Sequence, residues 1–161
     1  MSKKVAVYGM LVALAFLLSY VETLIPFSFA IPGIKVGLAN LVVITALYSL
    51  GEKGAFVISI VRIVLTGLTF TSLSVMLYSL GGGLLSFLCM VMAKRLTPLG
   101  VLGGVAHNLG QLLVAALVVR TGSLMYYFPA LLAAGTAAGA LIGILGGLVT
   151  ERLCPFLRQR A

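Results

Sequence analysis

The sequence predicts an all-α integral membrane protein, a bundle of six transmembrane helices in one domain covering residues 1–161. Its residues are 61% hydrophobic and only 9% charged, whereas a soluble domain carries about 25% charged residues. The apolar residues form runs long enough to cross a bilayer, because a helix needs about 20 residues to span a hydrocarbon core of ~30 Å. Cations gather at the ends of these runs, as in multi-pass membrane proteins.

Turn-forming or charged segments divide these apolar runs. IPFSFAIPG contains two prolines, GEKG and AKRLTP combine charge with glycine or proline, and RTGSLMYYFP precedes the last run; TFTS is the least marked break. The expected spans are residues 5–25, 34–50, 54–70, 72–93, 98–119 and 128–150.

The distribution of cations predicts the orientation of the chain. Six crossings place both termini on one side, and a cytoplasmic N-terminus would put most cations inside, as the positive-inside rule requires. Lys35 and Arg120 would lie outside, and Arg62 falls within a span. We therefore expect a multi-pass protein of the cell membrane with both termini cytoplasmic. The final RLCPFLRQRA is expected to be a short basic tail at the anionic inner leaflet. The cations expected inside are Lys3, Lys4, Lys53, Lys94, Arg95, Arg152, Arg158 and Arg160.

Composition excludes several function classes. The net charge of +8 does not form a basic stripe interleaved with aromatic residues, so we expect no nucleic-acid partner. The chain contains no aspartate and only three glutamates, which argues against carboxylate catalysis. Cys89 and Cys154 form no CxxC motif and are expected to be reduced structural thiols. GxxxxGK[ST] is absent, so no ATP binding by a P-loop is expected. We expect no metal and no cofactor.

Small residues recur at helical spacing in two spans. In the sixth, a glycine at every fourth position makes a groove that another backbone can approach. This groove is either an interface inside the bundle, which we favour, or a face presented to a ligand or a partner subunit. In the first span, Gly9 and Ala13 form a small-xxx-small pair with the same two interpretations, and internal packing is again slightly favoured. The glycines of the sixth span are Gly135, Gly139, Gly143 and Gly147.

The fifth span carries an unusual polar group in GGVAHNLGQLL. At 100° per residue, His107, Asn108 and Gln111 fall on the same side of the helix as four glycines, within an arc of roughly 160°. His107, the only histidine, lies near the expected midplane. Because glycines beside polar groups leave space, this side of the helix suits a ligand. The glycines are Gly100, Gly103, Gly104 and Gly110.

A second polar feature is Arg62, about eight residues into the third span. A charge at this depth costs roughly 2.5–3.5 kcal/mol, so it normally faces the interior and finds a partner. Glu22 is the one acid expected nearby, although Lys35 competes for it. Asn40 adds a polar group on the second span.

Two interpretations of these residues remain. In the structural one, Arg62 pairs with Glu22 and backbone carbonyls, while the polar residues of the fifth span join helices. In the functional one, which we favour, they line an outward-facing pocket for a small molecule with an anionic or carbonyl-rich group. A proton relay through His107 lacks an accompanying chain of acids. The aromatic residues near the outer face form an interfacial belt or, alternatively, a lid. They are Phe27, Phe29, Tyr126, Tyr127 and Phe128. The candidate substrate-binding residues are Arg62, His107, Asn108, Gln111, Asn40, Lys35 and Glu22.

The order of spans and several strings carry a family resemblance. The opening VYGMLVALAFLLSYVETLIPF resembles the substrate-binding S components of energy-coupling factor (ECF) transporters. IPGIKVGLANLVVITALYSLGEKGAFVISIVRIVLTG and LTPLGVLGGVAHNLGQLLVA are similar to one branch, the Gx transporter family, also labelled heptaprenyl diphosphate synthase component I. The resemblance covers nearly the whole chain, and GIKVGLAN and GGVAHNLGQ are its more specific strings.

The resemblance implies a bacterial membrane subunit that captures a small molecule from outside. In ECF systems such a subunit docks on a transmembrane T subunit driven by two cytoplasmic ATPases, and Gly9 and Ala13 match the docking positions. The family label also allows a non-catalytic membrane accessory of heptaprenyl diphosphate or menaquinone synthesis, or of extracytoplasmic flavin-linked electron transfer. Familiar prenyl-diphosphate synthases bind Mg²⁺ through DDxxD motifs, which a chain without aspartate lacks. Catalysis by this chain alone is therefore not expected.

Overall fold

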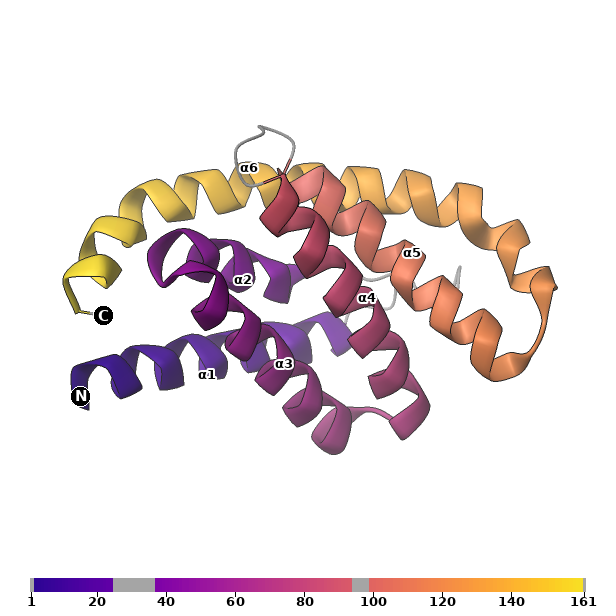
Figure 1. Ribbon diagram of the computed structural model, residues 1–161, viewed down its shortest axis with the longest axis horizontal. Coiled ribbons are helices and arrows are strands. Elements are labelled where there is room, and N and C mark those ends of the chain that lie inside the picture. Colours follow the sequence, from indigo (N-terminus) through magenta and orange to yellow (C-terminus); the bar gives the residue numbers. More distant parts are fainter. Residues whose placement is uncertain (1, 25–36, 94–98, 161) are drawn as a thin grey trace.

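The computed structural model describes residues 2–24, 37–93 and 99–160, and its regular elements are all helical. Figure 1 shows how they are arranged. The all-α class is thus confirmed. The elements are α1 (Ser2–Leu24), α2 (Leu38–Ser49), α3 (Gly51–Phe70), α4 (Leu73–Met92), α5 (Leu99–Val119), the short 3₁₀ helix η2 (Gly122–Tyr127) and α6 (Phe128–Arg160).

In the part of the chain that the structure describes, five helical segments are long and apolar enough to cross a membrane: α1, α3, α4, α5, and α6 together with η2. The second expected span, residues 34–50, differs from the others. Residues 34–36 lie outside the described part of the chain, and α2 itself has 12 residues. At 1.5 Å per residue α2 rises only about 18 Å, which is too short to cross the hydrocarbon core alone. The count of six crossings therefore stays a prediction.

Helix α2 lies among the other helices. It contacts α1, α3 and α6, and its core residues Val43, Ala46 and Leu47 are almost inaccessible to solvent. This packing agrees with a sequence that is apolar on every side, LANLVVITALYS, because a helix without a polar face is normally buried. The short helix is thus a central element of the bundle.

Helix α6 begins at Phe128, as expected, but continues to Arg160. The last ten residues, expected to be a short basic tail, thus continue the helix as far as Arg160, and their position at the inner leaflet stays a prediction. Leu157 and Cys154 are buried, so the helix is held by packing beyond the expected end of the span. Its 33 residues rise about 50 Å, and the helix curves along the molecule, with Pro155 inside its last turns (Figure 1).

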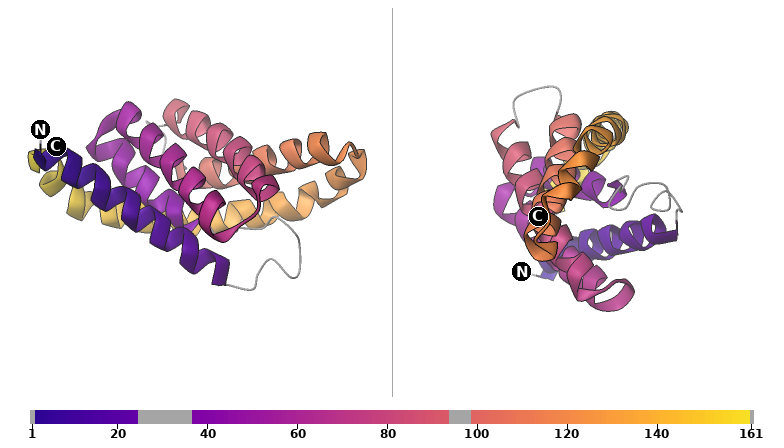
Figure 2. Two further views of the ribbon diagram at one scale, coloured as in Figure 1. Left: turned by 90° about the horizontal axis from the view of Figure 1, so that it is seen from below. Right: turned by 90° about the vertical axis from the view of Figure 1, so that its right-hand side faces the viewer.

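Both termini lie at the same end of the molecule, where the start of α1 approaches the end of α6 (Figures 1 and 2). This arrangement is what an even number of crossings produces. It agrees with the expectation that the two termini share one side of the membrane.

Helix α5 packs closely between α4 and α6, and glycines on both of its faces allow this. A Cβ on Gly104 would lie 2.5 Å from the carbonyl oxygen of Gly135, and one on Gly110 would lie 2.6 Å from that of Gly81. Gly139 and Gly143 also meet the backbone of α5. The favoured interpretation of the glycine row, an interface inside the bundle, is therefore confirmed for Gly135, Gly139 and Gly143. A Cβ on Gly147 would meet open space.

The small residues of α1 lie on its outer face. Gly9 and Ala13 are both exposed, and nothing lies within 4 Å of the position that a Cβ on Gly9 would take. The other side of the helix is buried in the core through Leu11 and Ala15. The expectation that Gly9 and Ala13 pack internally is therefore wrong, because α1 buries the side that carries Val7, Leu11 and Ala15.

Candidate functional site

The buried guanidinium of Arg62 joins three helices. Arg62 projects from α3 and is 8% exposed. Its Nη2 donates a hydrogen bond of 2.9 Å to Oδ1 of Asn40 on α2, and its Nη1 donates one of 3.4 Å to Oγ of Ser19 on α1. Its Nε is buried without a hydrogen-bond partner among the described residues. The hydrogen bonds of this cation therefore go to two neutral side chains.

Glu22 acts on the same region from α1. Its Oε1 accepts a hydrogen bond from the backbone N–H of Gly37, the residue that precedes α2. A carboxylate there is favourable because the first N–H groups of a helix lack intrahelical acceptors. Its charge also interacts electrostatically with Arg62. The negative charge of Glu22 thus partly balances the positive charge of Arg62. The hydrogen bond that Glu22 accepts from Gly37 fixes the start of α2.

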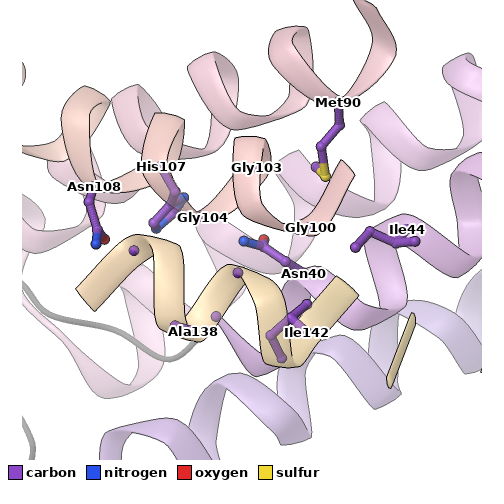
Figure 3. A pocket seen from close by; sticks show the side chains of 13 residues that line it. Asn40, Ile44, Met90, Gly100, Gly103, Gly104, His107, Asn108, Ala138 and Ile142 are labelled. Atoms are coloured by element: carbon purple, nitrogen blue, oxygen red, sulfur yellow. The ribbon is translucent and has the colours of Figure 1, made fainter. Parts of the chain in front are cut away.

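A narrow cleft lies beside the hydrogen-bonded side chains of Arg62 and Asn40. It lies between α2, α5 and α6, with Met90 of α4 at one side (Figure 3). Its unfilled volume is about 340 Å³, including space that is open to the outside, and the cleft is so narrow that it holds roughly one water molecule. A larger guest therefore requires the helices to separate. The cleft is lined by Gly37, Asn40, Ile44, Met90, Gly100, Gly103, Gly104, His107, Asn108, Gly135, Ala138, Gly139 and Ile142.

Three polar side chains converge on the cleft: Asn40 from α2, and His107 and Asn108 from α5. Figure 3 shows Asn40 projecting toward α5 and α6. Asn108 uses its Nδ2 to donate a hydrogen bond of 3.0 Å to the carbonyl oxygen of Leu131 on α6. All three side chains are less than 8% exposed. The cleft therefore combines glycine-lined walls with a few buried polar groups, as small-molecule sites do.

Gln111 lies on the side of α5 that faces α4, where the ring of His107 also reaches: its Cε1 lies 3.2 Å from the position that a Cβ on Gly82 would take. The Cγ of Gln111 lies 2.6 Å from the same position, and neither Gln111 nor Arg62 lines the cleft. Ser86, one turn further along α4, is 1% exposed. In the described part of the chain, Oγ of Ser86 and Oε1 of Gln111 have no hydrogen-bond partner. Both residues lie between α4 and α5, Ser86 opposite Gly103 and Gln111 opposite Gly82.

The structure thus places most of the candidate residues in the interior. Some of them line the cleft, and others, such as Arg62 and Gln111, are buried away from its lining. Asn40 is the link, because it accepts from Arg62 and also lines the cleft with His107 and Asn108. Lys35, Phe27 and Phe29 lie outside the described residues.

Ser19 and Ser86 are polar residues of the interior that were not expected from the sequence. A signal for Ser19 was its position three residues before Glu22, because residues i and i+3 share one face of a helix. The signal for Ser86 was its position four residues after Gly82, because residues i and i+4 also share one face of a helix. Within residues 2–24, 37–93 and 99–160, no group of three His, Cys, Asp or Glu side chains is placed to hold a metal ion.

Comparison with known proteins gives one match. Residues 11–149 match the sequence model of the family described as heptaprenyl diphosphate synthase component I. No curated protein and no solved structure matches the chain. The matched region includes all the candidate substrate-binding residues and Ala13. Because it covers most of the sequence, the chain belongs to the heptaprenyl diphosphate synthase component I family.

Proposed function

We propose that this protein is a substrate-binding subunit of an ECF-like transporter in the cell membrane, which captures a small molecule from the outer side. The observation that carries the proposal is the position of Asn40, which accepts a hydrogen bond from the buried Arg62 and lines the glycine-walled cleft. The guest would be a small molecule with an anionic or carbonyl-rich group, of a vitamin-, quinone- or prenyl-related kind.

The electrostatics of the described interior support an anionic guest. Arg62 is buried at a depth where a charge is costly, and its hydrogen bonds go to an amide and a hydroxyl. Glu22 balances the charge in part, while its Oε1 is engaged by Gly37. An anionic or carbonyl group in the cleft would add the stabilisation that these neutral partners do not supply.

Transport also requires a source of energy, which this chain does not supply through a P-loop. The exposed face of α1 around Gly9 and Ala13 supports docking on a T subunit that is coupled to two cytoplasmic ATPases. Small residues there allow close approach of another helix. With both termini cytoplasmic, as the cation distribution predicts, the start of α1 would lie on the side of the ATPases.

The family description favours a second candidate function. Its words name a component of a synthase, so the chain could serve instead as a non-catalytic membrane accessory of heptaprenyl diphosphate or menaquinone synthesis, or of extracytoplasmic flavin-linked electron transfer. In either role we propose that the chain binds rather than catalyses, because a sequence without aspartate offers no DDxxD site for Mg²⁺.

Native mass spectrometry of the protein released from native membranes in a mild detergent tests the proposal. We expect a retained small molecule in the wild type and its loss in Arg62→Met, with Arg152→Met as the matched control because Arg152 is exposed on α6. Size-exclusion chromatography reports folded yield for each variant. Copurification of a T subunit and ATPases would favour transport, whereas a soluble prenyltransferase or a redox protein would favour the accessory function. A wild type that neither retains a small molecule nor copurifies with ATPases would contradict the transport proposal.

A further inference from the structure

The hydrogen bonds of two amide side chains determine which of their atoms face the cleft. Oδ1 of Asn40 accepts from Arg62, and Nη2 of Arg62 can only donate, so the amide cannot be turned around. Nδ2 of Asn40 is therefore the atom left for the cleft, and it lies 3.3 Å from the position that a Cβ on Gly37 would take. The α2 side of the cleft thus presents N–H donors.

The amide of Asn108 has the opposite orientation. Its Nδ2 donates to the carbonyl oxygen of Leu131, and a carbonyl can only accept. Oδ1 is therefore the atom that Asn108 offers to the cleft it lines. The part of α5 around Asn108 thus presents a hydrogen-bond acceptor. His107, also on the lining, can donate or accept according to its tautomer and does not change this polarity.

Arg62 strengthens the donor side although it does not line the cleft. A hydrogen bond from a charged donor is stronger than one between neutral groups, and hydrogen bonds in a chain polarise one another. Donation by Arg62 to Oδ1 therefore makes the N–H groups of Asn40 better donors. In this way part of the effect of the positive charge reaches the cleft through the amide.

Apart from the two amides and His107, the cleft is lined by apolar residues and glycines. Glycines of α5 and α6 bring backbone directly to the cleft, and Ile44, Met90 and Ile142 provide apolar surface on the side of Asn40 that is away from Asn108 (Figure 3). A narrow space with such walls suits a planar ring better than a branched or bulky group.

From these features, and resting on the proposed function, we infer the class of guest. It is a compact, planar molecule with a carbonyl or carboxylate acceptor at the end that meets Asn40 and a hydroxyl or N–H donor at the end that meets Asn108. The reverse orientation would set donor against donor at Asn40 and acceptor against acceptor at Asn108, which leaves buried polar groups unpaired.

Three para-substituted benzenes test this polarity on the detergent-solubilised full-length protein by isothermal titration calorimetry. The probes are 4-hydroxybenzoate, which has both groups; 4-methoxybenzoate, whose donor is masked; and 4-methylphenol, which lacks the acceptor. We expect 4-hydroxybenzoate to bind at least about tenfold more tightly than either of the others, the factor that ~1.4 kcal/mol produces. Equal binding of all three, or no binding of any, would overturn the inference.

Two variants assign the ends. Asn40→Asp replaces the Nδ2 donors by a carboxylate oxygen in the same volume, so it is expected to lose both benzoates while its affinity for 4-methylphenol is unchanged. Asn108→Ala removes the acceptor, so it should bind 4-hydroxybenzoate and 4-methoxybenzoate equally. Thermal unfolding confirms folding, and Asn108→Leu, which also lacks the acceptor but fills a similar volume, provides a second variant if the alanine variant does not fold. Exchanged effects of the two sites would overturn the assignment.

The two proposals can fail separately. If the native protein retains a small molecule that depends on Arg62 but the probes show no preference, the polarity is wrong and substrate capture stands. If neither a retained molecule nor any probe is found, the proposed function fails together with this inference.

Discussion

The guanidinium of Arg62 on α3 donates a 2.9 Å hydrogen bond to Oδ1 of Asn40 on α2, across the interior of the bundle. Both side chains are at most 8% exposed, so neither is well solvated. Buried partners of this kind depend on each other, because removing one leaves the other without a substitute. This relationship makes the energetic coupling between the two positions measurable.

Asn40→Leu is expected to destabilise the protein by about 2 kcal/mol, because the buried cation loses its shorter hydrogen bond. Arg62→Met removes the charge and keeps an apolar side chain of similar length, so the double variant should be less destabilised than the sum of the two single variants. Thermal unfolding in detergent of the four proteins measures this coupling. Additive effects would show that the hydrogen bond contributes little.

Two glycines with positive φ angles, one before α2 and one at the start of α3, give a second prediction. Gly37 and Gly51 have φ angles of 78° and 82°, so alanine at either position is strained by about 1–2 kcal/mol. A Cβ on Gly37 would also lie 3.3 Å from Nδ2 of Asn40, whereas nothing lies within 4 Å of one on Gly51. Gly37→Ala and Gly51→Ala should therefore lose similar stability, while only Gly37→Ala weakens retention of the small molecule. Thermal unfolding and native mass spectrometry on both variants provide the comparison. Unimpaired retention in Gly37→Ala would argue against a role of Asn40 in binding.

Close packing of α5 on α6 makes Gly104 intolerant of a side chain. The Cβ of Gly104→Ala would lie 2.5 Å from the carbonyl oxygen of Gly135, and backbone cannot yield as a flexible side chain can. We expect a loss of about 1–3 kcal/mol. Gly147→Ala, where the Cβ meets open space, is the matched control and should be neutral or slightly stabilising. Unfolding temperatures measured side by side would reveal the difference, and equal temperatures would contradict the packing described here.

Sequence patterns predicted the helices well because apolar runs and glycine spacing are local properties. The glycine row of α6 predicted a helix–helix interface, because glycines at every fourth position form a groove that another backbone can approach. The length of α6 was missed because burial of Cys154 and Leu157 is a tertiary effect that no local signal contains. The outward direction of Gly9 and Ala13 was missed for the same reason: both sides of α1 are apolar in sequence.

The candidate site was predicted in composition but not in arrangement. A shared face of α5 brought His107 and Asn108 to one cleft, but Gln111, which lies with His107 against Gly82 of α4, does not line it. An arc of roughly 160° is wide enough to meet two neighbouring helices, and the sequence does not specify which ones. That Asn40 lies between Arg62 and the cleft likewise depends on tertiary packing alone.

The exposed face of α1 predicts a separation between partner docking and folding. Gly9→Leu places a large side chain on a surface with nothing within 4 Å, so the isolated subunit should fold and retain its small molecule as the wild type does. If a partner helix packs there, the same substitution should abolish copurification of that partner. Gly147→Leu, on the exposed part of α6, is the control for a leucine placed on another open surface. Undiminished copurification in Gly9→Leu would remove this face from the docking proposal.

The short α2 makes the number of crossings a question for experiment. If the segment around α2 crosses the membrane, Lys53 lies inside and Ser123 outside; both are exposed. In a background with Cys89 and Cys154 replaced by alanine, Ser123→Cys should react with a membrane-impermeant maleimide on intact cells. Lys53→Cys should react only after the membrane is permeabilised. Labelling of Lys53→Cys from outside would mean that the chain does not cross between α1 and α3. The direction in which α3 crosses would then be reversed, while Arg62 would still lie near the middle of that 20-residue helix.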